Sequence, residues 1–118
     1  MSYPLVNIVN STNYSASGTV EYASAFCSND NWGAGAGQPW TASSRGGCLV
    51  TGITANVDVN GTTIQATAYS SSGTSYSQFA LIQTGFGNPP TFEVTRRVSG
   101  TEDAQPEDYE EPTTQQKQ

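Results

Sequence analysis

Side chains able to catalyse a reaction are scarce in this sequence. The 118 residues include no histidine, so the commonest general base is missing and a Ser-His-Asp triad is impossible. A pair of carboxylates remains, because Glu21 and Glu93 fall on the outward faces of predicted strands. Carboxylates in such positions are typical of an ordinary soluble surface. We therefore expect a protein that is not an enzyme and carries no cofactor.

Metal ligands are equally sparse. Asn29, Asp30 and Asn31 offer oxygen atoms that suit Ca²⁺. The three residues are consecutive, however, and do not reproduce the alternating positions of a calcium-binding loop. Turn formation explains them as well as metal binding does. Two cysteines without histidine do not form an ordinary zinc site, and we predict no metal site.

The two cysteines bracket the longest irregular stretch of the chain, residues 28–47. A disulfide between Cys27 and Cys48 would close a loop of about 20 residues and stabilise the fold by roughly 3 kcal/mol; two buried thiols are the alternative. A disulfide implies an oxidising compartment. We therefore expect an extracellular or cell-surface location, although the N-terminal residues have no recognisable signal peptide and no transmembrane segment is visible.

Aromatic residues in and beside loops are the best candidates for binding. Rings set among Asn, Ser and Gly resemble surfaces that stack on sugar rings. The alternative is that Trp40 and the tyrosines close the ends of a small core, and for Trp32 the two interpretations are balanced. The candidate ligand-binding residues are Trp32, Trp40, Tyr69, Tyr76, Asn31 and Arg45.

The elements that position these residues are β-strands. Residues 48–69 show two runs of alternating apolar residues separated by Asn60-Gly61. This dipeptide favours a type I′ turn, because Asn tolerates and Gly readily adopts a positive φ. A long hairpin with one apolar face is not stable alone in water. The remaining chain must therefore cover that face, which predicts an all-β fold.

Further strands are predicted around this hairpin. We place them at residues 5–10, 18–26, 40–42, 76–84 and 92–98, with turns at 11–18 and 70–75. No helical periodicity is present. The predicted fold is a single antiparallel β-sandwich, jelly-roll or immunoglobulin-like, with six to eight strands over residues 1–100.

The charges separate the chain into two parts. Residues 1–100 carry four acids against three arginines, whereas residues 101–118 carry six acids against Lys117. A nearly neutral domain offers no electrostatic footprint for nucleic acid, so we expect no such partner. The acidic segment has too few aliphatic residues to offset its ordering entropy. We therefore predict a disordered acidic tail over residues 101–118.

Three functional hypotheses follow. The first is a non-enzymatic, lectin-like recognition module outside the cytosol, which binds a glycan or a cell-surface protein partner through its aromatic loop. The second is a self-assembling structural subunit, a homo-oligomer that polymerises by β-strand addition at residues 5–10, predicted to form an edge. The third is a membrane-active, haemolysin-like β protein.

Overall fold

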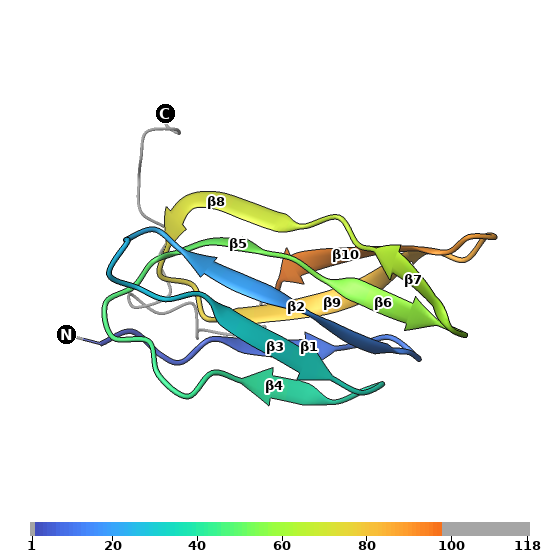
Figure 1. Cartoon of the computed structure of the whole chain (residues 1–118), viewed down its shortest axis with the longest axis horizontal. Helices are drawn as coiled ribbons and strands as arrows, with labels where there is room; N and C mark the ends of the chain where they lie inside the picture. The colour runs from blue at the N-terminus through green and yellow to red at the C-terminus, as the bar shows by residue number, and fades with distance from the viewer. Residues whose placement is uncertain (1, 98–118) are drawn as a thin grey trace.

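The protein is all-β in its computed structural model, which describes residues 2–97 (Figure 1). Within that range no helix is long and apolar enough to cross a membrane. The predicted acidic tail, residues 101–118, lies outside the described residues. Ten strands form in the described part: β1 (Asn7–Asn10), β2 (Ser15–Tyr22), β3 (Asp30–Ala34), β4 (Pro39–Thr41), β5 (Val50–Ile53), β6 (Asn56–Val59), β7 (Thr62–Gln65), β8 (Tyr69–Thr74), β9 (Gln78–Gly85) and β10 (Thr91–Arg96).

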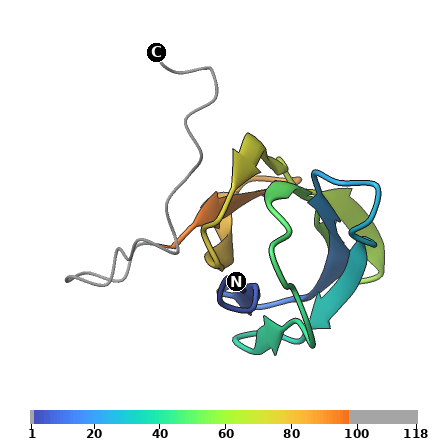
Figure 2. The ribbon, with the colours of Figure 1, turned by 90° about the vertical axis from the view of Figure 1, so that its left-hand side faces the viewer.

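Two sheets pack against each other, as the sandwich prediction requires. The four-stranded sheet has the order β10-β9-β1-β4. In the six-stranded sheet, β3 pairs with one edge of β2, while β6 and β5 pair with successive parts of the other edge. Thr67 joins the sheets along one seam, since its N–H donates to the carbonyl of Phe92 and its carbonyl accepts from Val94. Viewed end-on, the strands curve around a shared interior (Figure 2).

The core lies between the sheets and follows the predicted alternation. Phe79 and Leu81 of β9 and Phe92 and Val94 of β10 are buried at alternate positions, since successive side chains of a strand point to opposite faces. The six-stranded sheet supplies matching apolar residues. Those that are fully buried are Val20, Val50, Ile53 and Val57.

The central hairpin is confirmed, with its predicted turn. Asn60 and Gly61 have φ values of 53° and 89°, and the Gly61 N–H donates to Asp58 Oδ1 at 2.9 Å. The chain forms β5 before β6 and β8 after β7. β5 and β8 also pair with each other, with a register shift between Val50 and Gly52. The long predicted hairpin therefore appears as two strand pairs, which helps to explain why ten strands replace the predicted six to eight.

The N-terminal strand is not an edge, so that prediction was wrong. β1 pairs with β4 on one side and with β9 on the other, Asn7 lying opposite both Thr41 and Gln78. Its pairing with β9 is parallel, so the sandwich is not wholly antiparallel. An interior strand has its backbone groups satisfied on both sides. The structure therefore removes the edge on which strand-addition polymerisation was based.

Two local predictions also fail. β2 ends at Tyr22, and a turn closed by the Cys27 N–H and the Ser24 carbonyl replaces the predicted end of the strand. The serine-rich residues 70–75, predicted to be a turn, belong mostly to β8, where Ser71 donates to the Val50 carbonyl. Tyr69 starts this strand and Tyr76 follows its end.

Candidate functional site

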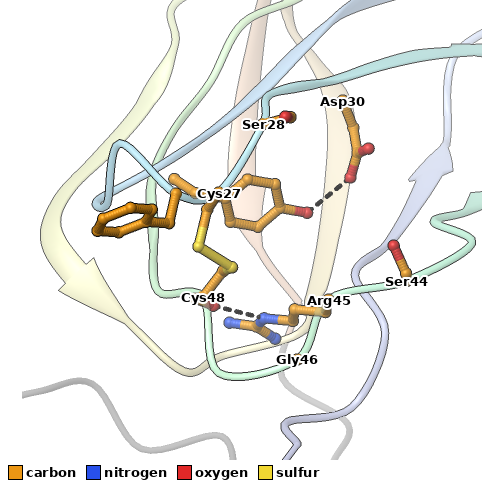
Figure 3. A pocket seen from close by; sticks show the side chains of 9 residues that line it. Cys27, Ser28, Asp30, Ser44, Arg45, Gly46 and Cys48 are labelled. Carbon is orange, nitrogen blue, oxygen red and sulfur yellow. Dashed lines mark hydrogen bonds between the residues drawn. A yellow bond between two sulfur atoms is a disulfide. The ribbon is translucent and has the colours of Figure 1, made fainter.

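A hollow of about 370 Å³ lies at the end of the molecule that carries the disulfide (Figure 3). Three segments form its walls: Tyr22 at the end of β2, residues 26–30 in the link to β3 and at its start, and residues 44–48 before β5. The hollow contains hydroxyl groups, a carboxylate and an exposed aromatic ring. Concave sites of this size and mixture are typical of small-molecule recognition.

The predicted disulfide is confirmed, and it forms part of this hollow. Cys27 and Cys48 are bonded, with their Cα atoms 6.1 Å apart. Figure 3 shows the bond joining the β2–β3 link to the segment that precedes β5. The two segments that face the hollow are thus covalently held together. A covalent link of this kind reduces the conformational freedom that a ligand would otherwise have to restrict on binding.

One polar pair is fixed in the wall. The Tyr22 hydroxyl donates to Asp30 Oδ2 at 2.8 Å. Burial raises the pKa of Tyr22 well above its usual range, and the hydrogen bond and the charge of Asp30 act in the same direction. Arg45 opposes these effects. Tyr22 therefore stays protonated and remains a donor to Asp30 across the ordinary pH range.

This pair leads to a prediction at alkaline pH. Above pH 10.0, the ordinary pKa of tyrosine, Tyr22 ionises in the unfolded chain before it does so in the folded protein. Its stabilising contribution is thus complete below pH 10.0 and is lost as the pH rises towards the folded-state pKa. We expect the melting temperature of the wild type to fall more steeply above pH 10.0 than that of Tyr22→Phe. Thermal unfolding followed by circular dichroism measures both slopes, and equal slopes would contradict the raised pKa.

Arg45 lies in the wall but serves as an internal brace. Its side chain is only 6% exposed. Its guanidinium donates to the carbonyls of Cys48, Pro4 and Thr74 at 2.9, 2.9 and 3.0 Å, and it lies 5.2 Å from the centre of the Tyr3 ring. Arg45 lines the hollow, so its predicted contact with a ligand stays a prediction, while these donors hold three distant chain segments together.

Trp32 is a core residue, which corrects the strongest aromatic candidate. It is 2% exposed, and its indole Nε1–H donates to the Thr54 carbonyl at 2.9 Å. Trp32 lies opposite Gly18 of β2. A Cβ atom at Gly18 would collide with the Thr54 carbonyl oxygen and lie 2.9 Å from the indole nitrogen. The absence of a side chain at Gly18 therefore makes room for the buried ring.

The remaining predicted residues do not gather in the hollow. Trp40 of β4 is half-buried and pairs with Ile8. Tyr69 packs edge-on against Phe79 at 4.9 Å, and Arg96 lies 3.6 Å above the Tyr76 ring. Asn31 of β3 is exposed but does not line the hollow.

Phe26 is the residue that the sequence prediction missed as a site residue. The predicted strand over residues 18–26 ends at Phe26, whereas this residue is 98% exposed at the rim of the hollow. The position of Cys27 is the signal that could have indicated this exposure. The strand has to end before Cys27 so that this residue can bond Cys48. Ser24 reinforces the turn, because its hydroxyl accepts from the Phe26 N–H at 3.0 Å.

Comparison with known proteins assigns no family. No protein-family model matches the chain. No curated protein and no solved structure matches it significantly either.

A second hollow, of about 310 Å³, lies beside the paired strands β2 and β6. Its lining includes Ser15, Ser17 and Asn56, which are small polar residues, and no aromatic ring. Its carboxylate, Asp58, already accepts the Gly61 N–H of the hairpin turn. The groups that suit a ligand are thus concentrated at the disulfide end, which we take as the candidate site.

Proposed function

We propose that this protein is a non-enzymatic recognition module that binds glycans of a cell surface or extracellular matrix at its disulfide end. The observation that supports this most is the position of Phe26. Its ring is almost completely exposed, directly beside Cys27 and at the rim of a polar hollow. The backbone that carries this ring is tied by the adjacent disulfide, so less of the chain has to be ordered on binding.

The groups around Phe26 match the two faces of a sugar. A sugar ring has an apolar C–H face, on which an aromatic ring packs, and an edge of hydroxyl groups. Ser28, Ser44 and Asp30 line the hollow and offer hydrogen-bonding groups for such hydroxyls. The residues that commonly catalyse sugar cleavage, two carboxylates about 5–10 Å apart, are not found among the lining residues, where Asp30 is the sole carboxylate.

The disulfide also supports a location outside the cytosol. Disulfides persist in oxidising compartments and are rare in the cytosol of mesophiles. In the described part of the chain every cysteine is paired. Glycans of cell surfaces and matrices are present in such compartments. The ligand that the groups of the hollow suit is therefore one that a protein outside the cytosol meets.

Phe26→Ser tests the proposal. We expect the wild type to bind a subset of glycans on an array, and Phe26→Ser to bind them about tenfold or more weakly, because losing one buried aromatic contact costs about 1.5 kcal/mol or more. Isothermal titration with soluble forms of the bound glycans would measure the ratio. The melting temperature should hardly change, because the lost ring makes few contacts in the free protein.

Phe86→Ser is the matched control. Phe86 is 82% exposed and lies in the β9–β10 link, at the opposite end of the long axis from the β2–β3 link (Figure 1). The same substitution there should leave glycan binding unchanged. Equal losses in both variants would point to non-specific apolar adsorption, and an array without any bound glycan would refute the proposed function.

A further inference from the structure

Asp30 lines the hollow, and one of its two carboxylate oxygens is bound within the protein. Its Oδ2 atom is occupied by the Tyr22 hydroxyl at 2.8 Å. Its Oδ1 atom accepts no hydrogen bond from another residue in the part of the chain that the structure describes. The side chain lines the hollow and is half-buried. A carboxylate oxygen in this position is satisfied either by water or by a hydrogen-bond donor of a ligand.

The donors near Asp30 are directed elsewhere. The Tyr22 proton is used on Asp30 itself. The Arg45 guanidinium, the positive group in the wall, donates to three backbone carbonyls from within the protein. Ser28 and Ser44 are neutral hydroxyls that both donate and accept. The Arg45 guanidinium keeps its positive charge in the wall, but these donors are bound to backbone carbonyls, so Asp30 is the charged lining group that offers a ligand an acceptor.

This distribution discriminates between sugars of different charge. A neutral saccharide can donate a hydroxyl to Asp30 Oδ1 and gain a charge-assisted hydrogen bond, which is stronger than one between two neutral groups. A sialylated or sulfated saccharide would bring a second negative charge to the same place. Like charges held at close range disfavour binding, and in a partly buried hollow the repulsion is only partly screened by salt.

Building on the proposed function, we propose that the site selects neutral saccharides through a hydroxyl donated to Asp30 Oδ1, and rejects acidic ones. Phe26 supplies the stacking surface for the sugar, and Asp30 sets the charge that is accepted. The two residues thus have separable roles, affinity for a sugar ring in one case and the choice between neutral and acidic sugars in the other.

Asp30→Asn tests this selection. An array of neutral oligosaccharides, printed beside their sialylated and sulfated forms, is probed with the full-length wild type and the variant. We expect the wild type to prefer the neutral members and the preference to fall about tenfold in Asp30→Asn, equivalent to about 1.4 kcal/mol. The fall is expected in either orientation of the Asn amide, because the charge is lost in both. Asp30→Ala should also weaken binding of the neutral members about tenfold.

Asp58→Asn is the matched control, because Asp58 lies in the other hollow. It should keep the wild-type preference, and circular dichroism would confirm that every variant is folded. Wild-type binding to neutral and acidic forms alike, or an unchanged preference in Asp30→Asn, would overturn this inference alone. A wild type that binds no glycan would overturn the proposed function together with it.

Discussion

Trp32→Ala is expected to lower the free energy of unfolding by about 3–5 kcal/mol. The ring of Trp32 on β3 is buried in the core beside Gly18 of β2, so its removal leaves a cavity that the surrounding residues only partly fill. The Thr54 carbonyl also loses the indole N–H as its partner. Small domains have only about 5–15 kcal/mol of stability in total, so much of the margin would disappear.

Urea unfolding followed by circular dichroism measures this loss. Trp32→Phe separates its two parts, since it keeps most of the ring volume but removes the N–H donor, and we expect a loss of about 1–2 kcal/mol. Trp40→Ala, at a half-buried edge position, should cost less than Trp32→Ala. A midpoint for Trp32→Ala close to that of the wild type would show that the ring is exposed, and would return Trp32 to the list of ligand-binding candidates.

The features that were predicted correctly depend on neighbouring residues. The turn at Asn60-Gly61 follows from the φ preferences of two residues. The buried positions of β9 and β10 follow from alternation within a few residues. The disulfide follows from two cysteines at the ends of one loop. In each case a short stretch of sequence contains the physical cause.

The features that were missed depend on partners distant in the sequence. The strand β8 contains Tyr-Ser-Ser-Ser-Gly-Thr and has almost no apolar pattern, and it extends because β5 supplies its hydrogen bonds. The interior place of β1 arises because the chain returns as β9 on one side and β4 lies on the other. Pairing of this kind leaves no signature within the segment itself, because tertiary contacts override local preference.

The candidate site shows the same limit at the level of single residues. Trp32 stands among Asn and Gly, which indicates exposure, but pairing with Gly18 buries it. Phe26 follows an alternating apolar run, which indicates burial, but it lies within the turn that the Ser24 carbonyl and the Cys27 N–H close. In the sequence, Arg45 stands between Ser and Gly, which indicates an exposed loop. Two of its three carbonyl partners, Pro4 and Thr74, lie far away in the chain. Whether each side chain is accessible was therefore decided by contacts that the local sequence does not encode.

Arg45→Met is the second substitution for which we expect a large loss, roughly 2–4 kcal/mol of unfolding free energy. The variant leaves the Pro4, Cys48 and Thr74 carbonyls without their guanidinium donors, and each unsatisfied buried acceptor costs about 1–3 kcal/mol. Part of that cost is offset, because the variant no longer buries a charge. Denaturant unfolding at neutral pH measures the net effect.

Two arginine variants establish why the loss occurs. Arg45→Lys keeps the charge but replaces a planar fork with a single ammonium group, so it cannot reach the three carbonyls in the same geometry and should recover only part of the stability. Arg96→Met removes a guanidinium that stacks on Tyr76, and should cost about 1 kcal/mol or less. A full recovery in Arg45→Lys would mean that charge matters more than geometry. Equal losses at positions 45 and 96 would mean that the three carbonyl bonds add nothing to the fold. The expected order, with Arg45→Met far below Arg96→Met, makes Arg45 the brace that holds residues 44–48 beside Phe26 and Asp30, where the proposed ligand binds.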